Sequence, residues 1–319
     1  MDNLKFDKSL QPEALTRLTL GVVANVVGEI SGTGNINWTP NGVTSSGAFE
    51  TRGLDFAAAF GPVTGLKGKI IFNDLLALAT PPGQQVTIAS VNPGTFVTGG
   101  VINYQLLPKQ QVAIESGAWP FAGGDLLLDP TTFDMGQETE RKLTFRVVGL
   151  DAAKFIQQLE FENLAATGIF DGIMPMYFDA SGGRIEGGRL VVRRGGGTLA
   201  YVGEISNAQM NVYAKLAFDA LKSIRYNNLA IALNGPLDGE IISQINFDGI
   251  NEAPLSPPKS FIARQFIGLP FVFNIKVTAP FRSLLNTART VQDPSSLLER
   301  TIPELRKPPV QPSESDTKP

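Results

Sequence analysis

Apolar and polar residues alternate along most of the chain between Leu20 and Thr278. A period of two is typical of β-strands that have one buried and one solvated face. Turn signals recur every ~8–12 residues, and the strongest, Pro40-Asn41-Gly42, directly follows an alternating run and predicts a hairpin. The pattern therefore predicts a mainly β protein, built as a long, twisted antiparallel sheet.

The apolar positions of these runs share one face of the predicted sheet, opposite polar residues such as Gln105, Gln244 and Asn274. They are Ile102, Tyr104, Leu106, Val112, Ile114, Leu143, Phe145, Val147, Leu190, Val192, Leu229, Ile231, Leu233, Ile241, Ile245, Phe247, Phe273, Ile275 and Val277. In a β-sandwich two such faces meet and form a closed core. In a single curved sheet they line an open hydrophobic groove, and the alternation alone is compatible with both.

Two or three short helices are expected beside the strands. Asp151 is a suitable N-cap for a helix over Ala152–Leu159. Apolar residues at helical spacing predict an amphipathic helix over 206–224, which would pack on the sheet or cover one end of a groove. The remaining organisation is a helix or linker over 1–18, strands over 19–150, glycine-rich hairpins within 151–205, strands over 225–280, a broken helix over 281–302 and a disordered tail over 303–319.

Composition narrows the functional classes. Apolar residues make up 43% of the chain and charged residues 18%, compared with a typical charged share of about 25%. The apolar surplus fits a large interior, a partner interface or an apolar groove. A net charge of −3 gives no electrostatic footprint for nucleic acid. The N-terminus lacks a signal-peptide pattern, so we expect a chain that works outside the cytoplasm to be part of a longer protein.

Catalytic chemistry finds little support in the residue types. Cysteine and histidine are absent, which excludes Ser-His-Asp and Cys-His catalysis and the common zinc sites. Carboxylates such as Asp171 and Asp179 lie near glycines, where aspartate caps turns. A glycosidase needs two carboxyl groups ~5–9.5 Å apart in a polar cleft, a geometry that the sequence leaves open. We expect no enzyme, no cofactor and no metal.

Two short segments could bind phosphate. Gly195-Gly196-Gly197 precedes a strand, whereas phosphate-binding loops lead into a helix, so these glycines predict a tight turn. Arg193 and Arg194 form a local basic cluster. A solvated sheet edge is the expected role of this pair, and binding of a lipid phosphate is the alternative.

The segment from Gly168 to Tyr201 reads GIFDGIMPMYFDASGGRIEGGRLVVRRGGGTLAY. Its glycines, at Asp171-Gly172, Ser181–Gly183, Gly187-Gly188 and Gly195–Gly197, predict turns between short extended runs. The segment resembles the C-terminal part of the YdbH family, AsmA-like bridge proteins of Gram-negative bacteria. In that family a GxxDGxxPxxFD…GGRIxGGRLxxRxGGGxLxY run is followed by a helix and further strands.

The resemblance implies a taco-like groove that passively carries phospholipid acyl chains between the inner and outer membranes. It also implies a periplasmic location, tethering to the inner membrane through a missing N-terminal part, and a YnbE-like small outer-membrane lipoprotein that adds strands to the C-terminal edge. Phe271–Thr278 is the candidate edge strand. The alternatives are a structural or partner-binding β-scaffold and a carboxylate-based, glycan-active enzyme. A β-solenoid would require a fixed internal repeat, which the chain lacks.

Overall fold

The computed structural model describes residues 3–15, 23–58, 61–91, 97–137, 139–158, 164–179, 182–201, 224–237, 239–251 and 270–280. Within these ranges the chain forms one 17-stranded sheet. All of its strand pairings are antiparallel. The prediction of a mainly β protein with one long antiparallel sheet is therefore confirmed.

The strands follow the alternating runs of the sequence. Their bounds are β1 Leu4–Phe6, β2 Val23–Thr39, β3 Gly42–Ala58, β4 Gly61–Phe72, β5 Gln84–Val91, β6 Val97–Leu107, β7 Gln111–Phe121, β8 Gly124–Leu128, β9 Thr131–Asp134, β10 Arg141–Asp151, β11 Leu164–Ala166, β12 Ile169–Asp179, β13 Gly182–Val192, β14 Gly197–Tyr201, β15 Ile224–Pro236, β16 Glu240–Asn251 and β17 Pro270–Pro280. A short 3-10 helix, η1, spans Pro12–Ala14, and helix α1 spans Ala152–Gln158.

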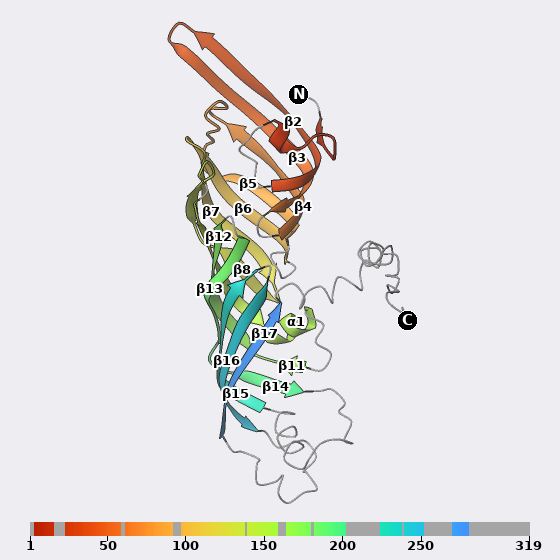
Figure 1. Ribbon diagram of the computed structural model, residues 1–319, viewed down its shortest axis with the longest axis vertical. Helices are drawn as coiled ribbons and strands as arrows, with labels where there is room; N and C mark the ends of the chain where they lie inside the picture. Colours follow the sequence, from red (N-terminus) through yellow and green to blue (C-terminus); the bar gives the residue numbers. More distant parts are fainter. Residues whose placement is uncertain are drawn as a thin grey trace, which may run out of the picture.

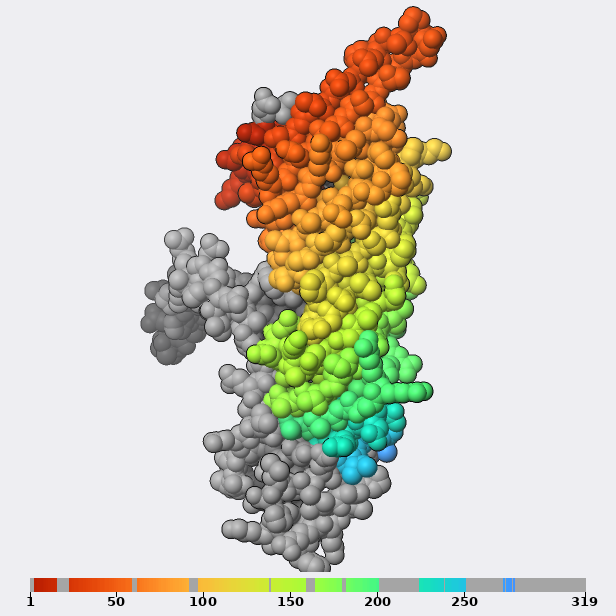
Figure 2. All heavy atoms as spheres, turned by 180° about the vertical axis from the view of Figure 1, so that it is seen from behind, coloured from red at the N-terminus to blue at the C-terminus, as the bar shows by residue number. Residues whose placement is uncertain are grey.

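The long strands pair in the order in which they occur in the chain. The ladder runs from β1 through β8, continues with β10, β12, β13 and β15, and ends with β16 and β17. Short strands fill the sides: β9 pairs with the first part of β7, and β14 joins β15 to β11. Sequence colours consequently succeed one another along the long axis (Figures 1 and 2). Residues 150 and 151, between which two of the predicted segments meet, both belong to strand β10.

The β2–β3 hairpin projects beyond the rest of the sheet (Figure 1). Its strands pair to the Thr39–Gly42 end, as Pro40-Asn41-Gly42 predicted, whereas pairing of β3 with β4 starts only at Gly47. Trp38 and its cross-strand partner Val43 are exposed near the tip. No charged residue lies between Glu29 and Glu50.

The predicted helices have different outcomes. Helix α1 begins where predicted, because Oδ1 of Asp151 accepts the N–H groups of Ala153 (2.9 Å) and Lys154 (3.4 Å). Over 1–18, where a helix or linker was expected, the described residues 3–15 form the short strand β1 and the 3-10 helix η1. The helix over 206–224 lies outside the described residues except for Ile224, which begins β15. The segments 281–302 and 303–319 also lie outside them.

Only some of the turns predicted at the glycines of the Gly168–Tyr201 segment are present. Asp171-Gly172 and Gly187-Gly188 do not form turns, because they lie within strands β12 and β13. Gly187 has a φ of 69° beside a break in the register of β13 with β15, which is typical of a β-bulge. The turn predicted at Gly195–Gly197 is present between β13 and β14.

Candidate functional site

One face of the sheet carries the buried core, and we call it the inner face. It is defined by Val63, Trp119, Val147, Leu190 and Phe247, members of one hydrophobic cluster that extends from β4 to β16. Alternation in each strand places every second side chain on this face. The sheet has no second sheet packed on it within the described residues, so the alternative of a closed β-sandwich finds no support in this part of the chain.

Cross-strand register aligns apolar residues into a continuous row on the inner face. Directly paired residues point to the same face of a sheet. In order across eight strands, the row consists of Trp119, Leu126, Val147, Gly172, Leu190, Ile231, Ile245 and Ile275. At ~4.8 Å per strand step, seven steps extend roughly 34 Å. The row is therefore much longer than a pocket that accommodates one side chain.

An apolar hollow of about 240 Å³ lies on the same face. All of its lining residues are apolar or aromatic, and they come from β5 to β10 and from β12. They are Ile88, Val91, Val97, Ile102, Ile114, Trp119, Leu126, Leu128, Phe133, Leu143, Phe145, Met176 and Phe178. Among the described residues, none of those that line this space is charged, so its interior suits hydrocarbon and disfavours an ionic ligand within it.

Two glycines make room for the aromatic wall of the hollow. A Cβ at Gly100 would lie 1.9 Å from Nε1 of Trp119, and one at Gly117 would lie 2.9 Å from the six-membered ring of the same indole. The indole therefore lies close over both backbones. Its ring centroid is 6.1 Å from that of Phe145. The glycines fix the position of the largest lining side chain.

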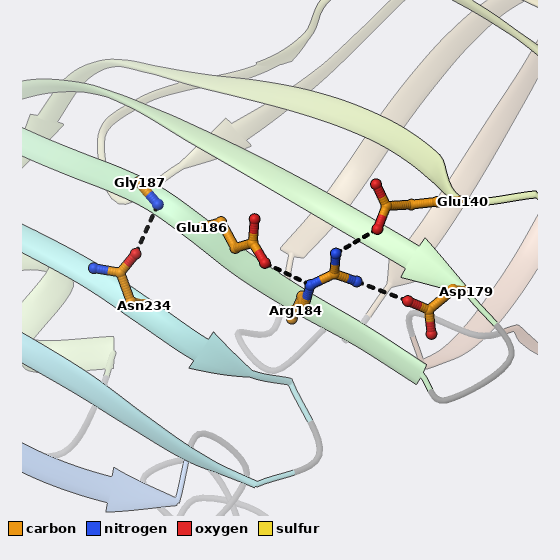
Figure 3. Close-up of polar contacts among 6 residues, drawn as sticks. All are labelled: Glu140, Asp179, Arg184, Glu186, Gly187 and Asn234. Atoms are coloured by element: carbon orange, nitrogen blue, oxygen red, sulfur yellow. Dashed lines mark hydrogen bonds and ion pairs between the residues drawn. The ribbon is translucent and has the colours of Figure 1, made fainter.

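The outer face carries ion pairs where the inner face carries hydrocarbon. Arg184 reaches carboxylates from three segments (Figure 3): Glu140 before β10, Asp179 at the end of β12 (2.8 Å) and Glu186 in β13 (2.7 Å). The hydrogen bonds to Glu186 and Glu140 raise the pKa of Arg184. This group of four residues ties the β12–β13 hairpin to β10.

A second ion pair ties the other end of the same hairpin. Arg193 donates from Nε and Nη2 to the two carboxylate oxygens of Asp171, each at 2.7 Å, and Asp171 also accepts the N–H of Gly149 at 2.9 Å. The Arg193 hydrogen bond, with a smaller contribution from Gly149, lowers the pKa of Asp171. Asp171 is therefore an ion-pair partner within strand β12 rather than the predicted turn cap, and Arg193 is half exposed and paired with a carboxylate.

Because this ion pair requires an ionised Asp171, the free energy of unfolding is expected to depend on pH. A lowered folded-state pKa means that the contribution is complete above the unfolded value of about 3.9 and is lost as the pH falls through the folded value. Asp171→Asn is expected to reduce the free energy of unfolding by at most about 1 kcal/mol at pH 7, because the pair is half exposed. The difference from the unmodified chain is expected to shrink below about pH 4. Urea unfolding at both pH values checks this, with Asp248→Asn on the outer side of β16 as control.

The nineteen residues predicted as groove lining all belong to strands of this sheet, but they separate by environment. Ile102, Ile114, Leu143 and Phe145 line the hollow. The others in the hydrophobic clusters are Val147, Leu190, Val192, Leu229, Ile231, Leu233, Ile241, Ile245 and Phe247. Tyr104, Leu106 and Val112 are half-buried, and Ile275 is exposed. Phe273 and Val277 are paired in β17 by their backbones; their side chains lie outside what the structure describes.

Several lining residues escaped the sequence interpretation. Trp119, Met176 and Phe178 line the hollow together with residues of β5, β8 and β9. A signal was available, because Met174, Met176 and Phe178 alternate in a single run. The described residues contain no helix long and apolar enough to cross a membrane. They also contain no group of three or more acidic residues placed to hold a metal ion.

Comparison with known proteins identifies a family. The family model described as YdbH-like, intermembrane phospholipid transport protein YdbH, matches residues 1–303. Searches of curated proteins and of solved structures returned no match. The match extends over nearly the whole chain, well beyond the glycine-rich segment that carried the resemblance.

Proposed function

Because the chain belongs to the YdbH-like family of intermembrane phospholipid transport proteins, we propose that its inner face is a passive conduit for phospholipid acyl chains. The observation that carries this proposal is the unbroken apolar row across eight strands, which meets the hollow at Trp119 and Leu126. A lipid chain would lie in a groove along this face with its polar head in water.

The energetics favour such a path. Each CH₂ group removed from water contributes ~0.8 kcal/mol, so a continuous apolar floor offsets part of the cost of moving an acyl chain across water. Ligand pockets usually measure roughly 300–1,000 Å³, and the hollow is smaller, at about 240 Å³. It holds a segment of an acyl chain rather than a whole phospholipid. A short binding segment within a longer apolar row suits passage more than storage.

The proposal includes no catalytic step. The carboxylates of the glycine-rich segment are engaged by arginines: Asp171 by Arg193, and Asp179 by Arg184. Both pairs are on the side of the sheet opposite the hollow. This arrangement supports a structural role for these acids over a role as an acid–base pair.

We also place this conduit in the periplasm, between the two membranes, with the inner membrane reached through a further N-terminal part. Strand β17 offers the edge for a small outer-membrane lipoprotein to pair with. Within the described residues β17 has β16 as its one neighbour, and Val272 is 73% exposed. Unpaired edges of this kind recruit further strands.

Site-specific photo-crosslinking tests the conduit. A photoreactive residue at Ile245 or Phe145 is expected to form phospholipid adducts, because both side chains belong to the inner-face cluster. Gln244 precedes Ile245 in β16 and is exposed on the other face, so the same probe there is expected to form none. Adducts are identified by mass spectrometry of the purified protein. Equal labelling at Ile245 and Gln244 would contradict the proposal.

A further inference from the structure

Arg141 is the first residue of β10 and belongs to the inner face. It has the same strand parity as Leu143 and Phe145, which line the hollow. Its cross-strand partner is Phe178, and its guanidinium carbon is 6.0 Å from the centre of the Phe133 ring. Both aromatic residues line the hollow. The guanidinium therefore lies at the rim of the apolar space, against its aromatic wall.

This arginine differs from others in neighbouring strands. Arg146, Arg184 and Arg193 are each paired with carboxylates. Among the described residues Arg141 has no carboxylate partner; its Nη2 donates at a long 3.4 Å to the carbonyl of Gln137. Its Nε–H is buried without a hydrogen-bond partner. A buried donor left unpaired is unfavourable and calls for an explanation.

We propose that Arg141 binds the phosphate of a phospholipid whose acyl chain occupies the hollow, an inference that rests on the proposed function and assigns its head-group contact. A guanidinium presents a planar fork of donors that matches phosphate oxygens, and it is less strongly hydrated than an ammonium group. A cation–π contact with Phe133 helps to orient the fork. A phosphate at the rim supplies the missing counter-charge while the hydrocarbon stays inside.

The same geometry moves the phosphate site away from the basic pair suggested by the sequence. Arg193 already donates from Nε and Nη2 to the carboxylate of Asp171, and it is on the outer face. A phosphate bound there would also be separated from the hollow by the sheet itself. Arg141, in contrast, places a positive charge next to the apolar hollow on the same face of the sheet.

The test uses the fluorescence of Trp119, which lines the hollow, to detect a bound acyl chain. The chain has two tryptophans, so a full-length chain carrying Trp38→Phe retains Trp119 as its sole indole. Vesicles containing phosphatidylglycerol, diacylglycerol or a fatty acid, each with brominated acyl chains, are titrated against this protein. Bromine quenches a nearby indole, so the fluorescence loss reports acyl-chain binding. Arg141→Gln is compared with Arg189→Gln, the same change at an exposed arginine of β13.

We expect phosphatidylglycerol to bind more tightly than diacylglycerol, and Arg141→Gln to weaken only the phospholipid, by about tenfold. Arg189→Gln is expected to change neither, and Arg141→Lys to restore part of the preference through its charge. Quenching by all lipids without a preference for phosphate would overturn the Arg141 assignment and leave the conduit standing. Dependence on Arg141 for the fatty acid alone would assign a carboxylate and overturn the phosphate. Absence of quenching by any lipid would overturn the conduit and this assignment together.

Discussion

Replacing Phe145 by glutamate is expected to abolish phospholipid transfer while the sheet remains folded. Phe145 lines the hollow beside Trp119 and packs against the main cluster. A carboxylate at this position places an ion on the acyl-chain path, where an unpaired charge in hydrocarbon is strongly unfavourable. Because Phe145 is only partly buried, the new side chain reaches water, and we expect a stability loss of about 1–3 kcal/mol.

Transfer of a fluorescent phospholipid from donor to acceptor vesicles measures this effect, and the amount of co-purified lipid provides a second readout. Gln244→Glu introduces the same carboxylate on the outer face, where Gln244 is exposed and directly opposite Lys276. It is expected to transfer lipid at the normal rate. Normal transfer by a folded Phe145→Glu protein would show that lipid does not pass through the hollow.

Replacing Gly196 by alanine is expected to cause the largest loss of stability among single glycine changes, about 2–4 kcal/mol. Gly196 has a φ of 62°, and a Cβ at this position would lie 1.9 Å from the carbonyl oxygen of Tyr226. Tyr226 is buried at 1% exposure, so it has little freedom to move. A Cβ at the adjacent Gly197 would lie 2.0 Å from the carbonyl oxygen of Thr167. Neither the turn nor its neighbours can accommodate a methyl group without shifting backbone.

Urea unfolding followed by circular dichroism measures this loss. Gly53→Ala is the matched control, because Gly53 lies in β3 with no atom within 4 Å of an added Cβ. We expect its effect to stay within about 1 kcal/mol. Equal stability of the Gly196 and Gly53 variants would mean that the turn does not approach β15 as closely as described.

Alternation predicted the strands and their faces because successive side chains of a strand point to opposite faces wherever the strand begins and ends. Ile245 and Gln244, for example, occupy opposite faces as their order in the sequence requires. The pattern fails locally where one strand gains a residue. Between Ile185 and Gly188 the register with β15 shifts. The Gly187-Gly188 pair at this bulge is a dipeptide that is also common in turns. Sequence composition does not distinguish a bulge from a turn.

The hollow was harder to predict than the face on which it lies. Ile102 and Phe145 could be assigned from alternation, but the contact of Trp119 with Gly100 depends on how far a side chain leans across to the next strand. The role of Arg141 was hidden for a related reason. Its parity is visible in the sequence, whereas its position beside Phe133 arises from the pairing of β9 with β7 and of β8 with both β7 and β10. Such contacts depend on curvature and register, which are properties of the assembled sheet.

The pairing of strands in chain order makes this molecule nearly one-dimensional in its energetics. Each long strand gains most of its stabilisation from the strands immediately before and after it, as in repeat proteins, so stability is distributed as a sum of neighbour terms. Unfolding is then expected to start at the ends and to advance strand by strand, with amide protons near β7 and β10 exchanging last. The same property lets a sheet of this kind lengthen by one hairpin at a time without any rearrangement of the core already formed.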